Sequence, residues 1–219
     1  MTTTQEKTLT EVVTCEDGLK RSPWAANNPL LEEYYDTEWG VPLYEEQDLF
    51  ELLCLEGFQA GLSWATVLRK RDAFRRAFAD FDPEVVATFD EAKVEQLLND
   101  ASIIRNRRKI ESAINNAKAT LELRAEGGLS EFIWSFTPLE TPCPVYAEDV
   151  PQTSPESCAM SKALRKAGFS FVGPVTCFAM MEALGMVDTH LVGSHRRGRT
   201  GIWAPSSRDG QLARQSSES

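Results

Sequence analysis

A single carboxylate stands near several large aromatic side chains in the first third of the chain. Glu56 lies between Leu55 and Gly57 at the end of an apolar segment, where a carboxylate is at least partly buried and needs a partner. That partner is either a ligand group that donates hydrogen bonds or a structural arginine. When Glu56 is considered by itself, the structural arginine is the favoured interpretation. The large aromatic residues near Glu56 belong to residues 34–42 and 55–64, and they are Tyr34, Trp39 and Trp64.

A helical hairpin with two glycines is the second feature that could do chemistry. A helix runs into Gly168, a tight connection ends at Gly173, and Pro174 occupies the first turn of the next helix. The unpaired N–H groups at the start of that helix suit a phosphate oxygen, and Lys166 adds positive charge beside them. An ordinary hairpin in which Gly168 ends the first helix is the alternative.

Asp188 follows the second helix of this hairpin, between Val187 and Thr189. This order resembles the helix-hairpin-helix superfamily of DNA glycosylases, in which a helix pair binds the DNA backbone and an aspartate just beyond it faces the scissile nucleotide. The resemblance implies that Asp188 sits at that aspartate position. A cap for the segment that follows is the structural alternative.

Ordered matches to one family run from about Arg21 to Gly193. They comprise Trp24, Tyr34, Glu38–Pro42, Leu55–Gly57, Gln59–Trp64, Ile103–Arg107, Phe132–Phe136 and Gly168–Gly173. These segments resemble the bacterial 3-methyladenine DNA glycosylase I family. The resemblance implies an all-α, helix-hairpin-helix DNA glycosylase fold. It also implies an enzyme that hydrolyses the N-glycosidic bond of 3-methyladenine in alkylated DNA, with 3-methylguanine left open as a substrate.

The resemblance assigns roles to residues of these segments. Glu56 would accept hydrogen bonds from the amino edge of the extruded adenine, and the loop around Leu62 and Ser63 would wedge into the gap left in the base stack. Phe58 stands where the family often has glutamine, which leaves the base preference open. The base pocket would be lined by Trp24, Tyr34, Trp39, Phe58 and Trp64, and the hairpin surface on DNA by Lys166, Gly168, Phe169, Ser170, Phe171 and Gly173.

The chemistry of the implied substrate suits these residue types. A 3-methylated deoxyadenosine carries a positive charge on its base, so the base leaves as a neutral molecule without protonation. Aromatic faces attract such a ring by about 0.5–2 kcal/mol per contact, and Glu56 adds charge complementarity that normal adenine uses less. Asp188, where the family commonly has asparagine, would steady the cationic sugar or orient the water. We find no lysine placed to form a Schiff base, so we expect a glycosylase that leaves the strand uncut.

A zinc site implied by the family is degenerate in this sequence. The family's ligands are a Cys near the start, a His just after the pocket Tyr, and a C-terminal His and Cys. Those positions read Ser22, Tyr35, His190 and Ser194. Neutral hydroxyls bind zinc poorly, so we expect no zinc and no other cofactor, and hydrogen bonds among these side chains joining the two ends of the domain. A substitute ligand set that recruits Cys15 and His195 is the alternative.

The elements that must position these residues are helical almost throughout, so the sequence predicts an all-α domain. Ser63 and Asp90 are typical N-caps, and alternating strand patterns are scarce. The segment from Thr137 to Pro155 is rich in Pro and Thr and indicates a surface loop. We expect a flexible leader over residues 1–20, one helical domain over residues 21–204 and a disordered tail over residues 205–219.

Bulk composition agrees with a single domain that meets DNA through local patches. The 219 residues are 42% hydrophobic, which is enough for one core, and no apolar run is long enough to cross a bilayer. The net charge of −10 argues against a non-specific DNA coat protein but allows local basic patches to bind phosphate. The five scattered cysteines contain no Cys-x-x-Cys pair, which indicates reduced thiols and a cytoplasmic protein.

The expected partner is double-stranded DNA that contains alkylated bases. We expect no membrane partner, no obligatory protein partner, and a monomer that sits at the bacterial nucleoid while it acts. Two other interpretations remain. A non-catalytic reader of alkylated DNA on the same fold would bind the lesion without releasing base. An unrelated helical interaction protein would not bind an abasic-site analogue.

Overall fold

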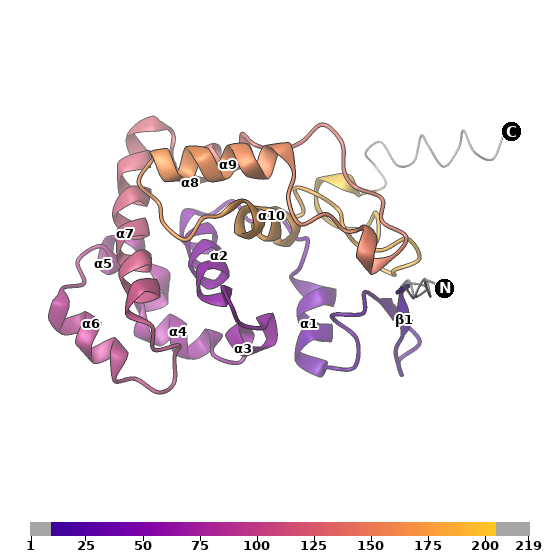
Figure 1. Ribbon diagram of the computed structural model, residues 1–219, viewed down its shortest axis with the longest axis horizontal. Helices are drawn as coiled ribbons and strands as arrows, with labels where there is room; N and C mark the ends of the chain where they lie inside the picture. The colour runs from indigo at the N-terminus through magenta and orange to yellow at the C-terminus, as the bar shows by residue number, and fades with distance from the viewer. Residues whose placement is uncertain (1–9, 205–219) are drawn as a thin grey trace, which may run out of the picture.

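Ten α-helices build most of the computed structural model, which describes residues 10–204 (Figure 1). The all-α prediction is therefore confirmed for this part of the chain. A short antiparallel ribbon, β1 (Val13–Thr14) paired with β2 (Lys20–Arg21), precedes the helices. The helices are α1 (Pro29–Thr37), α2 (Glu46–Gln59), α3 (Trp64–Leu68), α4 (Arg71–Ala77), α5 (Pro83–Val86), α6 (Glu91–Leu98), α7 (Arg107–Leu123), α8 (Gly128–Trp134), α9 (Pro155–Lys166) and α10 (Pro174–Ala183).

Capping side chains fix where several of these helices begin. Both predicted caps are confirmed. Ser63 Oγ accepts a hydrogen bond from the Thr66 N–H at 3.3 Å at the start of α3. Asp90 Oδ1 accepts one from the Lys93 N–H at 2.9 Å at the start of α6. Each such cap stabilises its helix by about 1 kcal/mol.

Helix α2 lies at the centre of the domain and is buried on most of its faces. It contacts α3, α7, α8 and α10 (Figure 1). An apolar run supplies this burial, since residues 52–58 are buried without a break. A helix that is apolar nearly all round must lie inside the molecule. Because Glu56 belongs to this helix, its carboxylate is withdrawn from bulk water.

The segment before α1 is tied to the rest of the domain. The flexible leader expected over residues 1–20 is therefore wrong for residues 10–20, which contain β1 and pair it with β2. Thr10 N and Thr10 Oγ1 donate to the Glu148 carboxylate at 2.9 and 2.7 Å, and Ala147 N donates to Thr10 O at 2.8 Å. The first two contacts span 138 positions, so no local sequence pattern predicts them. Residues 1–9 and the tail predicted over residues 205–219 lie outside the described residues.

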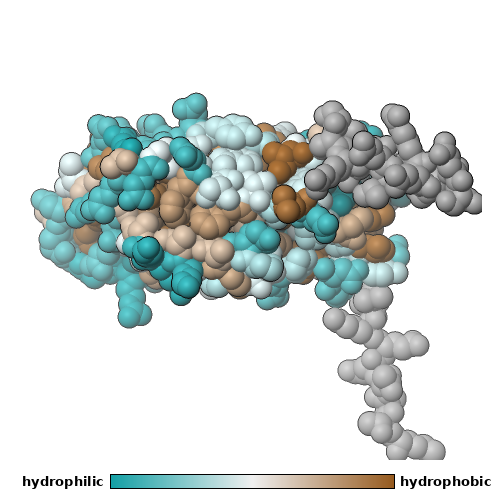
Figure 2. All heavy atoms as spheres, turned by 90° about the horizontal axis from the view of Figure 1, so that it is seen from above, coloured by the Kyte–Doolittle hydropathy of each residue, from teal (hydrophilic) through white to brown (hydrophobic). Residues whose placement is uncertain are grey.

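The predicted surface loop from Thr137 to Pro155 is a long irregular connection between α8 and α9, interrupted by one short 3-10 turn at Ala147–Asp149. It runs beside the N-terminal segment, through the Thr10 contacts, and bounds the cavity described below. Seen from above, polar side chains cover much of the surface and an apolar band crosses its middle (Figure 2). No helix among residues 10–204 is long and apolar enough to span a membrane.

Candidate active site

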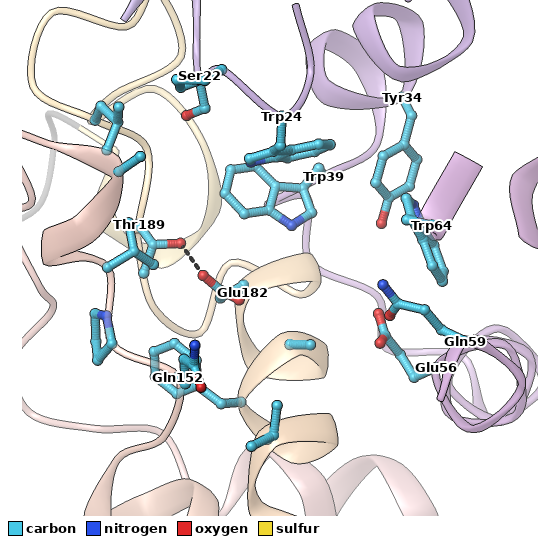
Figure 3. Close-up of a pocket in the computed structure, with 18 of the residues that line it drawn as sticks. Ser22, Trp24, Tyr34, Trp39, Glu56, Gln59, Trp64, Gln152, Glu182 and Thr189 are labelled. Carbon is cyan, nitrogen blue, oxygen red and sulfur yellow. Dashed lines mark hydrogen bonds between the residues drawn. The ribbon is translucent and has the colours of Figure 1, made fainter. Parts of the chain in front are cut away.

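A cavity of about 710 Å³ opens between α1, α2 and α10 (Figure 3). Its size suits a small flat ligand. Glu56 and Gln59 of α2 face it from one side, and α10 and the loop around residues 147–152 face it from the other. Four of the five predicted aromatic residues line it, namely Trp24, Tyr34, Trp39 and Trp64.

The aromatic wall is built from rings that pack at steep angles to one another. Between ring centroids, Trp24 lies 5.1 Å from Trp39, and Tyr34 lies 5.4 Å from Trp64. Trp24 is 41% exposed, so it forms the rim of the cavity. Burial, and next the charge of Glu56, raises the pKa of Tyr34 well above its usual value, so the hydroxyl keeps its proton and can donate a hydrogen bond.

The Glu56 carboxylate is buried in the cavity without a partner. The residue is 6% exposed, and no group of residues 10–204 donates a hydrogen bond to its carboxylate. The sequence favoured a structural arginine as the partner of Glu56, but no arginine among residues 10–204 forms an ion pair with it. Arg71 of α4 pairs with Glu38 instead. Burial, and next the charge of Glu182, raises the pKa of Glu56 to about 8. An unpartnered buried carboxylate aimed into a pocket points to a ligand that completes it.

Glu182 of α10 is a second carboxylate in the cavity, and the sequence analysis missed it. Thr189 Oγ1 donates to Glu182 Oε1 at 2.6 Å, the contact drawn in Figure 3. Burial raises the pKa of Glu182 to about 7, although the Thr189 hydrogen bond acts against that rise. Val175, Phe178, Ala179 and Glu182 all line the cavity, and this helical spacing was the signal in the sequence that could have found it.

Phe58 lies outside the cavity, so its predicted contact with the base is wrong. Its ring is 1% exposed and packs 4.5 Å from Phe74 and 5.7 Å from Phe78, measured between centroids. Residues two apart on an α-helix point about 200° apart, so Glu56 and Phe58 face opposite sides of α2. Gln59, three residues after Glu56, faces the cavity instead (Figure 3).

Asp188 also lies outside the lining of the cavity, against the prediction that it faces the scissile nucleotide. His190 Nδ1 lies 2.7 Å from Asp188 Oδ1, and the Gly198 N–H donates to Asp188 Oδ2 at 2.8 Å. Burial raises the pKa of Asp188, but the contacts with His190 and Gly198 outweigh it and leave the pKa below its usual value. The structural alternative therefore holds, because Asp188 fixes the segment after α10 that carries Thr189.

The predicted helical hairpin joins α9 to α10. Gly168 has a φ of +90°, and the Phe169 N–H donates to Leu164 O at 2.9 Å, so this glycine does end α9 as the alternative proposed. Gly173 precedes α10 and provides no side-chain cap for it. An ordinary hairpin and a phosphate-binding hairpin are therefore compatible interpretations. Gly168 ends α9, and the first N–H groups of α10 have no side-chain cap, so they can still bind a phosphate.

Asn116 of α7 fixes the connection between α9 and α10 through hydrogen bonds to the main chain of Ser170. Asn116 Oδ1 accepts a hydrogen bond from the Ser170 N–H at 2.8 Å, and Asn116 Nδ2 donates to Ser170 O at 3.0 Å. Lys166 and Phe171 are exposed, whereas Phe169 is buried. Of the hairpin residues predicted to contact DNA, Phe169 and Ser170 therefore position the turn, and the exposed ones form its surface.

The loop between α2 and α3 carries the predicted wedge. Leu62 is exposed, and Ser63 begins α3 as its cap. Lys109 of α7 is buried under this loop, where its Nζ donates to Phe58 O at 2.8 Å and to Ala60 O at 2.6 Å. A buried cation that satisfies the carbonyl end of α2 holds the loop in place.

The four degenerate zinc positions meet in space, and we call them, together with Arg21, Asp36 and His195, the terminal junction. Ser22 Oγ lies 3.2 Å from Tyr35 OH, and Tyr35 OH lies 2.6 Å from Ser194 Oγ. The predicted hydrogen bonds are confirmed for these three side chains. The His190 ring packs edge to face with the Tyr35 ring, 5.0 Å apart between centroids, and its Nδ1 bonds Asp188 instead.

This donor set does not fit a structural zinc ion, because three of its members are neutral hydroxyls that already bond one another. The described residues contain no group of three or more His, Cys, Asp and Glu side chains that could hold a metal. Ion pairs around the Asp36 carboxylate also hold the terminal junction together. The buried Arg21 guanidinium contacts Asp36 at 2.6 Å, and His195 Nε2 lies 3.1 Å from the same carboxylate.

The family model of methyladenine glycosylase matches residues 24–197 of this chain. The chain belongs to the methyladenine glycosylase family. The resemblance found in the sequence is thereby confirmed, and with it the helix-hairpin-helix glycosylase fold.

Relatives of known name agree with this membership. The chain is 46% identical to "DNA-3-methyladenine glycosylase 1" of Escherichia coli (strain K12) over 179 residues, which is 80% of this chain and 95% of that protein. It is 43% identical to "DNA-3-methyladenine glycosylase" of Haemophilus influenzae, over 78% of this chain and 94% of that protein.

Solved structures give the same result. The fold resembles a crystal structure of 3-methyladenine DNA glycosylase I with a TM-score of 0.78 and 42% identity, covering 81% of this chain and 99% of the other. It also resembles a variant of 3-methyladenine DNA glycosylase I in complex with 3-methyladenine, with a TM-score of 0.76 and 35% identity, over 81% of this chain and 97% of the other.

Proposed function

We propose that this chain is a DNA-repair glycosylase that hydrolyses the N-glycosidic bond of 3-methyladenine in alkylated DNA. The observation that carries the proposal is the buried Glu56 carboxylate, which faces an aromatic cavity and has no partner among residues 10–204. An extruded adenine would complete it, because the amino edge of the base donates the hydrogen bonds that this carboxylate lacks. The names of the relatives support the same substrate.

The cavity supplies what the chemistry of this lesion requires. The methylated base is a cation in the nucleoside, and it leaves as a neutral molecule, so no group has to protonate it. Each ring of the aromatic wall attracts the cation by about 0.5–2 kcal/mol. Glu56 adds a hydrogen-bond acceptor with negative charge when ionised. Unmodified adenine has the amino edge but lacks the charge, so it gains less from both features.

The exposed hairpin and loop suit the DNA around the flipped nucleotide. The N–H groups at the start of α10 would hold a phosphate, with Lys166 beside them. Leu62, exposed in the loop between α2 and α3, would fill the gap that the extruded nucleotide leaves. A monomer that contacts only DNA in this way needs no protein partner, and in a bacterial cell it would act in the cytoplasm, at the nucleoid.

The reaction we propose ends with base release and leaves the strand intact. Cleavage by a Schiff-base route needs a lysine at the sugar, and none of the described residues that line the cavity is a lysine. Asp188 is occupied by His190 and Gly198, so any effect of Asp188 on the sugar or on the attacking water would be indirect. Thr189, the residue it positions, lines the cavity.

Release of free base tests this proposal. Duplex DNA treated with a methylating agent is incubated with the protein, and the released bases are separated by chromatography. We expect 3-methyladenine among the products, and the amount of 3-methylguanine measures the specificity. Binding to the alkylated duplex with no released base would contradict the proposal and favour a non-catalytic reader of alkylated DNA.

A further inference from the structure

Glu182 reaches the cavity from a helix that the aromatic wall does not use. It lies on α10 opposite Glu56, which comes from α2 (Figure 3). A ligand between the two helices therefore has one carboxyl group on each side. The established features of the site, an aromatic wall and one recognising carboxylate, leave this second carboxylate without a role.

One oxygen of Glu182 is held and the other is open. Thr189 Oγ1 donates to Oε1 at 2.6 Å, whereas Oε2 accepts no hydrogen bond from the described residues. Thr189 is itself placed by its neighbour Asp188, whose main-chain N–H and C=O both bond Thr141 Oγ1. The chain thus orients the Glu182 carboxylate, and the described residues that line the cavity place no cation against it.

The charges around the cavity are all of one sign. Of the described residues that line it, two are glutamates and none is Lys, Arg or His. The two carboxyl groups feel each other, because the charge of Glu182 contributes to the raised pKa of Glu56. A cation placed between them would favour the ionised form of both, whereas a neutral ligand leaves the like charges uncompensated.

We propose that Glu182 is a second specificity-determining residue of the base cavity, whose carboxylate, oriented by Thr189, selects cationic N3-alkylated purines over neutral purines. This inference rests on the proposed function, since it names the charge that the same cavity selects. Glu56 recognises the amino edge that adenine and 3-methyladenine share. Glu182 responds to the charge that only the alkylated base carries, so the two carboxylates divide recognition between them.

The test compares a cationic base with a neutral base of the same shape. Single-turnover excision of 3-methyladenine from a duplex measures the cationic case. Affinity for a duplex that contains 3-deaza-3-methyladenine, in which a carbon replaces the methylated nitrogen, measures the neutral case. Glu182→Gln keeps the oxygen that Thr189 binds and removes the charge. We expect E182Q to slow excision about ten-fold or more and to change affinity for the neutral duplex less than about two-fold.

Two further variants make the result specific. Glu122→Gln removes one negative charge from the exposed face of α7, and we expect it to behave as the wild type in both assays. Thr189→Val keeps the carboxyl group of Glu182 but removes the hydrogen bond that orients it and lowers its pKa, and we expect the same pattern as E182Q with a smaller loss. If E182Q does not fold, T189V still tests the proposal.

The outcomes separate this inference from the proposed function. Equal losses in excision and in affinity for the neutral duplex would show that Glu182 only supports the fold, and a wild-type rate for E182Q would show that its charge is not used; either result overturns the inference alone. A wild-type protein that releases no 3-methyladenine would overturn the proposed function as well, and no variant is needed to see it.

Discussion

Two buried polar groups of the base cavity, the Glu56 carboxylate and the Trp64 N–H, lack partners, whereas most buried polar groups of the terminal junction are paired. In the cavity, Glu56 accepts no hydrogen bond from residues 10–204, and Trp64 Nε1 is buried without an acceptor. At the terminal junction, Tyr35 OH contacts two hydroxyls and Arg21 contacts two carboxylates. Orphaned polar groups cost stability, so they persist where a ligand completes them.

The two regions use similar residue types for different purposes. The terminal junction joins the ends of the domain with side chains that satisfy one another, apart from His190 Nε2, which has no partner among the described residues. The cavity keeps the Glu56 carboxylate and the Trp64 N–H open at the expense of stability. This difference predicts that removing a charge stabilises the cavity and destabilises the terminal junction, and the following experiments test that contrast from the largest expected effect to the smallest.

Glu56→Gln should show the cost of the open carboxylate as a function of pH. The ordinary pKa of 4.5 applies in the unfolded chain, and burial and Glu182 raise the folded value to about 8. The folded protein therefore binds an extra proton between these pH values, so wild-type stability falls as pH rises from 4.5 to 8 and then levels off. Glutamine does not titrate. Relative to wild type, E56Q should gain up to about 5 kcal/mol across this range.

Urea unfolding of both proteins at pH 5 and pH 8.5 measures this gain. Two other titratable groups are coupled to Glu56: the charge of Glu182 raises the pKa of Glu56, and the charge of Glu56 raises the pKa of Tyr34. Both groups remain in both proteins. A stability difference that stays the same at the two pH values would mean that Glu56 is not held in its neutral form.

Arg21→Ala should lower the free energy of unfolding, opposite to the gain expected for E56Q, because it removes a charge from the terminal junction. It removes a buried guanidinium from its contacts with Asp17 and Asp36, and because these two carboxylates are partly exposed the loss should be about 1–3 kcal/mol. Unfolding in urea gives the value. Arg105→Ala is the matched control because Arg105 is exposed, and it should change stability by less than about 0.5 kcal/mol. A loss as small as that of the control would show that the pair does not hold the ends together.

Tyr35→Phe should cost about 1–2 kcal/mol, since it removes the hydrogen bonds to Ser22 and Ser194 at about 1 kcal/mol each. The same account predicts a wild-type protein without zinc, whose melting temperature a chelator does not change. Elemental analysis of the purified protein checks this. One tightly held zinc ion per chain, lost with stability on chelation, would contradict the hydrogen-bonded terminal junction.

Lys166→Ala should have the smallest effect, and on DNA binding only. Lys166 is exposed at the end of α9, so its loss should weaken binding to all duplexes alike and reduce the slope of log affinity against log salt by about one. Lys93→Ala on α6 is a control that should leave the slope unchanged. An unchanged slope for K166A would place the phosphate elsewhere.

The sequence predicted those features that depend on local pattern. The helix caps at Ser63 and Asp90 and the hairpin around Gly168 follow from residue type and spacing, and the structure has them. The aromatic wall of Tyr34, Trp39 and Trp64 was implied by the family resemblance, and these residues do line the cavity. Family resemblance added the pocket role of Trp24, which no local pattern indicates. The buried environment of Glu56 followed from its apolar neighbours.

The misses have physical causes that a single sequence hides. Phe58 was misplaced because the phase of α2 turns it away from Glu56. Asp188 was misplaced because its orientation is set by contacts with His190 and Gly198, which follow it in the chain. The order of residues 10–20 depends on Glu148, far away in sequence. Glu182 was visible only as one position on the apolar helix α10.

Base release by wild type and by Glu56→Gln, measured on the same methylated duplex, tests the central claim most directly. The claim is that the cavity leaves a buried carboxylate open in order to recognise the base. Wild type should release 3-methyladenine, and E56Q should do so roughly 100-fold more slowly while it binds undamaged duplex with unchanged affinity. A near wild-type rate for E56Q, or an equal loss of affinity for undamaged duplex, would contradict it.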